Sequence, residues 1–457
     1  MRVVFINPKG ANNEDDYELP SNIAYLAAAV EKADFIGEIE VLDLDLLYFP
    51  VDEDSAQQFN EKFLKGRPDE ASTIFALPIY TYCAKETEKM CAIIRRFKKR
   101  AKIIVGGPHI TLNGLGVIRD NSAIDFALAG EADFSFRELL KRLAHGESLE
   151  GIDGLYYREN GVAKGNKFPE RIENMASLPS QTDGFKYLDM KTIKEKVGYC
   201  SYIASRGCVF SCVFCSSANL WGHKLKYLPA KTVIAELGTI KQMGFDVVTF
   251  RDDFFTMNKP WMNEILPCLK ELGLTWGCET RIDAVDEKTL VAMKESGCKN
   301  LRFGIETFND KSLRILNKKI DPILAVKNLE LALKIGIEEV RSSFMVGIPG
   351  ETKEDVLRTV AICRTLKPMR PRFRALTPYI KTRLYENMEE YGIRFVKEPH
   401  KLGYSQIETD TMTNTEINEL LHGIYAEFKN PKESYYHNDF SMVLTDKKWK
   451  TKASEVS

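Results

Sequence analysis

Three cysteines, Cys208, Cys212 and Cys215, stand close together in a loop that follows the apolar stretch 199–205. Thiolates are the ligands of iron–sulfur clusters, and four of them saturate a four-iron cluster. The next cysteines along the chain are Cys200 and Cys268, so the loop itself offers three thiolates. Three thiolates leave one iron without a protein ligand, and an iron of this kind can bind a substrate.

Two other interpretations of these cysteines stay open at this point. A structural zinc site needs a fourth ligand, and only Cys200 or His223 lies nearby, at no familiar spacing. Buried free cysteines can also act simply as small hydrophobic side chains.

The stretch 206–215, Arg-Gly-Cys-Val-Phe-Ser-Cys-Val-Phe-Cys, resembles the cluster-binding signature of the radical SAM enzymes. The resemblance implies a [4Fe-4S] cluster whose open iron chelates the amino and carboxylate groups of S-adenosyl-L-methionine (SAM). In that family an electron from the cluster cleaves SAM to a 5′-deoxyadenosyl radical. Phe214, the aromatic residue before the last cysteine, is then expected to lie against the adenine.

The length, charge and cysteine content of the chain predict its domain number and limit the kinds of partner and location that fit it. A chain of 457 residues is expected to form two or three domains. The formal net charge of −1 gives no sign of a nucleic-acid partner. The apolar runs are too short to span a membrane. Ten cysteines without a recognisable secretory leader predict a reducing, cytoplasmic location.

Residues 1–146 predict a doubly wound, Rossmann-like parallel sheet, because short apolar strands alternate with amphipathic helices. Pro20 precedes Ser21, which is a favourable N-cap for the first helix. The expected strands are 3–6, 39–43, 73–77, 103–105 and 124–128. The first expected helix follows Ser21, the second carries Met90, Cys91, Ile94 and Phe97, and the closing helix carries Phe136, Leu139, Leu140 and Leu143.

Ligands of such sheets bind beyond the carboxyl ends of the strands, where this chain places glycines and polar residues. Each one alone is explained as a turn residue. Together they resemble the B12-binding (cobalamin-binding) domain fused to one subclass of radical SAM enzymes. The Asp-x-His-x-x-Gly signature is absent, which implies no histidine ligand to cobalt from that motif, and a domain that has lost its cofactor stays open. The candidate cobalamin contacts are Asn7, Tyr82, Gly106, Gly107, His109, Thr111, Gly130 and Glu131.

Gly106 and Gly107 are expected to tolerate no side chain, because an added carbon would strike the corrin ring. On this expectation a Gly107→Val protein folds but binds no corrinoid. Residues 147–196 predict a tether between two domains, with a hairpin around the Asn160-Gly161 turn.

Residues 197–378 repeat a strand, loop and helix pattern six times, which predicts a partial (β/α)6 barrel with its site at the strand carboxyl ends. The strands are expected at 199–205, 246–250, 275–278, 300–303, 343–346 and 373–376.

Polar residues follow nearly every one of these strands. A single one is often a helix N-cap, but several at one barrel mouth indicate a site. The resemblance implies that Asp252 and Asp253 hold the SAM amino group and that Glu306 contacts the ribose or carboxylate. It also implies that Glu279 and Arg281 bind polar ends of SAM or the substrate. The stretch 345–351, with Val346 and Ile348, is expected to receive the adenine.

Residues 379–457 predict a small α-rich region, with helices near 384–391 and 417–424, that caps the substrate pocket. Some aromatic residues are candidate substrate contacts, although core packing explains each of them as well. They are Trp221, His223, Tyr404, Tyr435, Tyr436 and His437.

The resemblance implies a cobalamin-dependent methyltransferase that acts on an unactivated carbon or phosphorus of a small molecule. It also implies a reducing partner such as flavodoxin or ferredoxin, with neither nucleic acid nor membrane involved. Two alternatives stay open. One is a radical SAM enzyme that performs cyclisation, rearrangement or dehydration, with or without cobalamin. The other is a non-enzymatic corrinoid- or metal-binding module.

Overall fold

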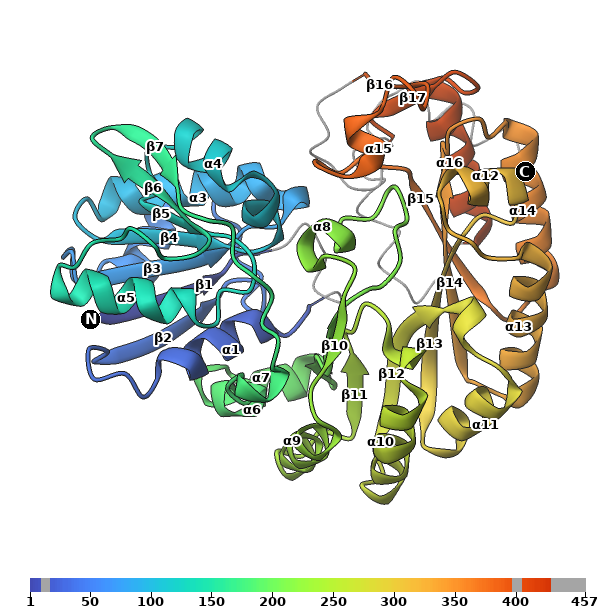
Figure 1. Ribbon diagram of the computed structural model, residues 1–457, viewed down its shortest axis with the longest axis horizontal. Helices are drawn as coiled ribbons and strands as arrows, with labels where there is room; N and C mark the ends of the chain where they lie inside the picture. Colours follow the sequence, from blue (N-terminus) through green and yellow to red (C-terminus); the bar gives the residue numbers. More distant parts are fainter. Residues whose placement is uncertain (10–16, 397–404, 429–457) are drawn as a thin grey trace.

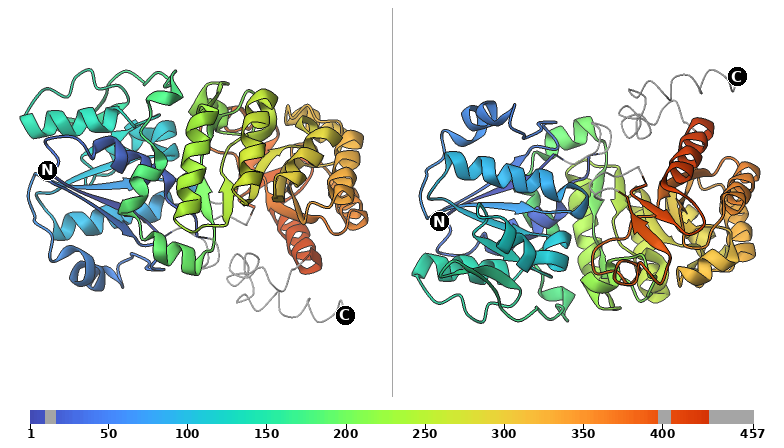
Figure 2. Two further views of the ribbon diagram at one scale, coloured as in Figure 1. Left: turned by 90° about the horizontal axis from the view of Figure 1, so that it is seen from below. Right: turned by 90° about the horizontal axis from the view of Figure 1, so that it is seen from above.

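The computed structural model describes residues 1–9, 17–396 and 405–428, which form two α/β units side by side (Figure 1). Each unit is built on one large sheet, of seven strands in the first and six in the second. The short helix α8 (Ser217–Trp221) lies between the two units in Figure 1. Figure 2, which shows the molecule from below and from above, also places the two units side by side.

The first unit contains the expected doubly wound sheet, with strand order β2-β1-β3-β4-β5 in its parallel part. Successive residues of β1 pack on opposite faces: Val4 contacts the core beneath α3 and α4, and Phe5 contacts the core beneath α1 and α5. The elements are β1 (Arg2–Asn7), α1 (Ser21–Val30), β2 (Glu38–Asp43), β3 (Thr73–Pro78), α3 (Ala84–Phe97), β4 (Lys102–Gly106), α4 (Pro108–Asp120), β5 (Phe126–Leu128) and α5 (Ser135–His145).

The hairpin expected in the linker belongs to the first sheet, so a first domain that ends at residue 146 is too short. β6 (Leu155–Glu159) pairs antiparallel with β5, and β7 (Val162–Gly165) pairs with β6. Asn160 and Gly161 close the turn with φ of 51° and 82°. The hairpin covers the edge that the three-residue strand β5 would otherwise expose.

The connector after this hairpin is folded against both units and is more than a tether. It contains α6 (Gln181–Gly184) and α7 (Met190–Lys196). The buried Gln181 amide donates to Ser21 Oγ (2.9 Å) and to the Ser201 carbonyl (3.3 Å), one in each unit. Ser21 is therefore not the N-cap of α1; Pro20 holds that position, and the Ser21 hydroxyl bonds to the connector.

The second unit is the expected six-stranded parallel sheet, with order β15-β14-β13-β12-β11-β8 and with β8 and β15 at its edges. Its outer face carries the largest hydrophobic core, which the helices cover. The elements are β8 (Cys200–Tyr202), α9 (Ala230–Gln242), β11 (Val247–Phe250), α10 (Lys259–Glu271), β12 (Thr275–Arg281), α11 (Glu287–Glu295), β13 (Cys298–Glu306), α12 (Asp310–Ile315), α13 (Pro322–Ile335), β14 (Glu339–Val346), α14 (Lys353–Thr365) and β15 (Arg370–Ala375).

The C-terminal region is less helical than expected. The helix predicted near 384–391 is only the single turn α15 (Arg383–Glu386). It is followed by the hairpin of β16 (Ile393–Phe395) and β17 (Ile407–Thr409). The second predicted helix is α16 (Asn414–Phe428), which packs on the outer face of β15, where the Tyr425 hydroxyl donates to the Phe373 carbonyl (2.5 Å).

Candidate active site between the two units

The three cysteines lie in a loop that leaves the short strand β9 (Ser205–Gly207) and enters α8. Gly207 has φ of 106°, and a Cβ there would lie 2.0 Å from the Lys224 carbonyl, so the turn into the loop requires glycine. Cys208, Cys212 and Cys215 are all partly exposed, whereas most of the other cysteines are buried. The fold therefore presents these three thiols together on one loop.

A neighbouring segment of the barrel fixes the shape of the cysteine loop. The Val213 amide donates to the Leu316 carbonyl (3.1 Å), and the Asn317 amide group donates to the Ser211 carbonyl (2.9 Å). The Leu384 amide in turn donates to the Val213 carbonyl (2.9 Å). The backbone of the loop is thus held from two sides, which preorganises its thiols for ligand binding.

The two aspartates after β11 have different environments. Asp252 is 2% exposed and accepts from the Ala204 amide (3.3 Å), and burial raises its pKa to about 7. Its side chain therefore faces the core. Asp253 is exposed to the space above the sheet and bonds to Ser217 Oγ (3.3 Å) in α8. Of the two, only Asp253 is placed to meet a ligand.

A buried ion pair lies at the carboxyl ends of the barrel strands, next to the cysteine loop. Lys318 Nζ lies 2.8 Å from Glu306 Oε1, and both residues are less than 8% exposed. Burial lowers the pKa of Lys318, but the charges of Glu306 and Cys212 and the hydrogen bond to Glu306 together raise it above its ordinary value. Lys318 also lies 5.7 Å from the centre of the Phe214 ring, within the cysteine loop.

Arg281 and Glu279 occupy the same strand end and differ in burial. Arg281 is 6% exposed, bonds to Asp283 (2.8 Å) and stacks 3.7 Å from the centre of the Phe210 ring. Glu279 is exposed and pairs with Arg302 (3.1 Å) on the neighbouring strand. Arg281 therefore supports the cysteine loop, and Glu279 is open to the interior of the barrel.

Val346 and Ile348, which are expected to receive the adenine, are completely buried. Glu351, at the end of the same stretch, is 1% exposed, and burial raises its pKa to about 8. Its Oε1 accepts from Thr307 (3.1 Å), while its Oε2 has no hydrogen-bond partner among the described residues.

A cavity of about 320 Å3 lies between the first unit and the part of the second unit that carries the cysteine loop. Its first wall consists of the carboxyl ends of β3, β4 and β5 and one face of α1, and its second wall consists of residues around β9, α8 and β11. The lining is mostly apolar and includes no histidine. Residues on the second wall include Ser205, Arg206, Leu220, Trp221, Arg251 and Asp253.

The structure divides the residues expected to bind cobalamin. Gly106, Gly107, Thr111, Gly130 and Glu131 line the cavity. The other three lie outside its lining and have protein partners: Asn7 bonds to Asp43 (2.8 Å), Tyr82 stacks on Tyr80, and His109 contacts Thr81 (3.3 Å).

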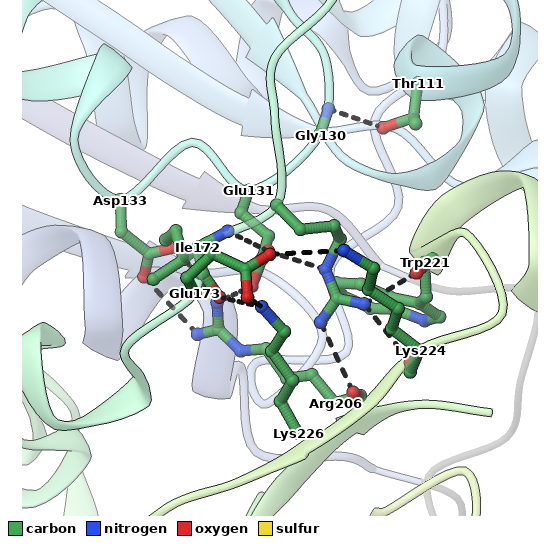
Figure 3. Close-up of polar contacts among 11 residues, drawn as sticks. Thr111, Gly130, Glu131, Asp133, Ile172, Glu173, Arg206, Trp221, Lys224 and Lys226 are labelled. Carbon is green, nitrogen blue, oxygen red and sulfur yellow. Dashed lines mark hydrogen bonds and ion pairs between the residues drawn. The ribbon is translucent and has the colours of Figure 1, made fainter. Parts of the chain in front are cut away.

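Glu131 is a cavity residue whose carboxylate is already fully paired (Figure 3). Its side chain is 2% exposed; Oε1 lies 3.0 Å from Arg206, and Oε2 lies 2.8 Å from Arg171. Arg206 also pairs with Asp133 (3.0 Å). Two arginines and the Ile172 amide thus contact both oxygens of Glu131, and a direct contact between Glu131 and a cofactor stays a prediction.

The residues present suit an iron–sulfur cluster and a corrinoid. Four-iron clusters take each thiolate on a separate iron, and the three partly exposed cysteines of the loop supply such a set. Among the described residues, no three His, Cys, Asp or Glu side chains lie close enough together to hold a single metal ion. The cavity offers a large planar ligand apolar surface and the bare backbone of Gly106 and Gly130.

Sequence reasoning missed several residues that shape this site. Lys318 stands beside Lys319 and has the pattern of surface charge. Arg171 lies in the connector, and Arg206 drew attention only as part of the cysteine stretch. Of the aromatic candidates, Trp221 lines the cavity and His223 bonds to the Phe210 carbonyl (3.2 Å). Tyr404, Tyr435, Tyr436 and His437 lie outside the described residues.

Comparison with known proteins links this architecture to a family. Residues 202–363 match the model of the radical SAM superfamily. An uncharacterized methyltransferase of Pyrococcus horikoshii is 30% identical over 90% of this chain and 87% of its own. The anaerobic magnesium-protoporphyrin IX monomethyl ester cyclase of Rubrivivax gelatinosus is 23% identical over 94% of this chain and 77% of its own.

A solved structure has the same fold. The radical S-adenosylmethionine methyltransferase TsrM of Kitasatospora setae, with cobalamin and a [4Fe-4S] cluster bound, superimposes with a TM-score of 0.72 at 16% identity. The match covers 95% of this chain and 90% of TsrM. Separately, no helix among the described residues is both long and apolar enough to cross a membrane.

Proposed function

The chain belongs to the radical SAM superfamily, and we propose that it is a cobalamin-dependent methyltransferase acting on an unactivated carbon or phosphorus of a small molecule. One observation carries the proposal: a single cavity is walled on one side by glycine-rich strand ends and on the other by residues next to the cysteine loop. Two cofactors held on these walls would face each other across a space that excludes bulk water.

When bound, the cluster and SAM supply a radical that removes hydrogen from the substrate, and the corrinoid supplies the methyl group. Cys208, Cys212 and Cys215 would hold three irons. Asp253 is placed to accept hydrogen bonds from the SAM amino group. Glu306 and Lys318 form a charged pair that would orient the polar ends of SAM.

Names of relatives support methyl transfer. The Pyrococcus horikoshii relative is named a methyltransferase, and the cytidylyl-2-hydroxyethylphosphonate methyltransferase of Streptomyces wedmorensis is 24% identical over 76% of this chain. Cyclisation is the second candidate, because the Rubrivivax gelatinosus cyclase aligns with nearly the whole chain. A rearrangement or dehydration enzyme would share the cluster and SAM site.

The corrinoid content separates these functions. The cluster-loaded protein is incubated with hydroxocobalamin, freed of excess ligand and examined by visible spectroscopy. Roughly one corrinoid per chain, as one cavity predicts, supports the methyltransferase. SAM cleavage without any bound corrinoid would contradict the proposal and favour cyclisation, rearrangement or dehydration. Corrinoid binding without SAM cleavage would indicate a non-enzymatic carrier.

The chemistry also needs an electron donor, for which we propose a flavodoxin or ferredoxin. All ten cysteines are free thiols, which supports a reducing compartment, and we place the enzyme in the cytoplasm.

A further inference from the structure

Four charged residues bridge the two units at the edge of the cavity: Glu131, Asp133, Arg171 and Arg206, here called the acid–arginine cluster. Glu131, Asp133 and Arg206 are labelled in Figure 3. Their side chains are between 2% and 12% exposed. Arg171 Nη1 donates to the Trp221 carbonyl (2.7 Å), and its Nη2 donates to the Arg206 carbonyl (3.3 Å). The acid–arginine cluster therefore joins the β5–α5 loop, the connector and the antiparallel pair of β9 and β10 (Leu225–Tyr227).

One carboxylate of this cluster reaches both walls of the cavity. On the first wall, Glu131 follows Gly130, whose amide donates to the Thr111 hydroxyl (2.9 Å). On the second wall, its partner Arg206 stands two positions before Cys208, the first cysteine of the loop. The Arg206 guanidinium also lies 4.9 Å from the centre of the Tyr25 ring, in α1 of the first unit.

We propose that the acid–arginine cluster is a positioning element that fixes the distance between the cysteine loop and the ligand held on the strand ends of the first unit. This inference rests on the proposed function, because the distance matters only if both walls carry a cofactor. Displacements of about 1 Å in a reacting pair can cost on the order of a hundredfold in rate. A buried carboxylate with both oxygens occupied resists such displacement more than exposed contacts do.

The charge of Glu131 is the feature to remove. Glu131→Gln keeps the shape of the side chain, but its amide NH2 then faces a buried guanidinium and leaves it without a carboxylate partner. Asp133→Asn is a milder second variant, since Asp133 pairs with Arg206 alone among these arginines. Glu173→Gln is the matched control, because Glu173 pairs with Lys224 and Lys226 in the same region but its side chain is 72% exposed.

The first readout is the magnetic coupling between the reduced cluster and one-electron-reduced corrinoid in the loaded protein. Both centres are paramagnetic, and their dipolar coupling falls with the cube of their separation. We expect one defined coupling in wild type and in Glu173→Gln. We expect a weaker or broadened coupling in Glu131→Gln and Asp133→Asn, with iron and corrinoid content per chain unchanged. Wild-type coupling in both Glu131→Gln and Asp133→Asn would overturn the inference.

The second readout needs no corrinoid. Amide hydrogen exchange of the protein loaded with its iron–sulfur cluster reports how firmly residues 128–133 and 203–207 are held. Loss of charge-assisted hydrogen bonds in Glu131→Gln should speed exchange at both segments about tenfold or more, and Glu173→Gln should not. Unchanged exchange in Glu131→Gln would overturn the positioning role. If wild type binds no corrinoid, the proposed function fails on its own. The exchange measurement then still decides whether the acid–arginine cluster holds segments 128–133 and 203–207 in place.

Discussion

At the scale of single residues, Lys318 is a site residue that the structure identifies and the sequence analysis did not. Its ammonium neutralises Glu306 in a buried pair at the barrel mouth. Lys318→Met would leave the Glu306 carboxylate buried and unpaired, which typically costs about 3–5 kcal/mol of folding free energy. Urea unfolding measures this loss. The neighbouring Lys319 is exposed, so Lys319→Met is the matched control, and equal stability of the two variants would contradict the role of the pair.

Asp252 predicts a pH dependence of stability with a defined sign. Its folded-state pKa of about 7 lies above the ordinary value of 3.8, so the folded protein binds the proton more tightly than the unfolded chain does. Stability from this group is complete below about pH 4 and falls as the pH rises towards 7, by about 1.4 kcal/mol per pH unit.

Asp252→Asn removes that ionisation and keeps an oxygen that can accept from the Ala204 amide. Between pH 5 and pH 7 wild type should lose about 2–3 kcal/mol relative to the variant. Urea unfolding at the two pH values measures the difference. Parallel pH profiles for the two proteins would show that Asp252 does not titrate in this range. Because Asp252 faces the core, SAM affinity should change little in the variant.

At the scale of elements, the cysteine loop makes the sharpest prediction. Alanine at Cys208, Cys212 or Cys215 removes one of only three thiolates and should abolish iron binding and SAM cleavage. Cys268 is also partly exposed but lies in α10, away from the loop, so Cys268→Ala should keep both properties. Iron analysis and 5′-deoxyadenosine assays measure the outcome. A Cys212→Ala protein with full iron content would exclude the assigned cluster.

Elements with a strong local pattern were predictable, and elements that depend on distant partners were not. Apolar strands such as β3 and β14 and the amphipathic α13 occur where the sequence indicates them. The hairpin β6–β7 was recognised as a hairpin, but its pairing with β5 is a tertiary contact without a local signal. The helix expected near 384–391 stops after one turn at Asn387, whose φ of −122° is not helical, and the chain passes through turns at 387–392 into β16.

At the scale of the whole molecule, the candidate site could be predicted only one wall at a time. The cysteines and the strand-end glycines carry recognisable patterns, and the structure places the glycines on one wall of a cavity whose other wall is formed by residues next to the cysteine loop. The pairing of Glu131 with Arg206 joins residues 75 positions apart, and no pattern of spacing indicates it. The sequence therefore did not indicate that the Glu131 carboxylate pairs with arginines of the connector and of the second unit.

The backbone geometry of the cavity wall shows that Gly106, and not Gly107, is the better glycine for testing corrinoid binding. Gly107 has φ of 97°, and a Cβ there would lie 3.0 Å from the Ile79 carbonyl, so Gly107→Val strains the first unit whether or not a ligand is bound. Gly106 also lines the cavity but has no such strain, and its Cβ would meet only the Leu128 carbonyl at 3.6 Å. Gly106 is therefore the position at which a side chain competes with the ligand alone.

We expect Gly106→Val to fold, to retain its iron and to cleave SAM, because the substitution lies in the first unit, away from the cysteine loop. It should bind hydroxocobalamin at least tenfold more weakly than wild type, since the isopropyl group takes space that the flat ligand needs. Visible spectra after reconstitution give the corrinoid content, and iron and 5′-deoxyadenosine assays serve as internal controls. Wild-type corrinoid binding in this variant would place the corrinoid away from β4 and separate it from the cavity that the two units share.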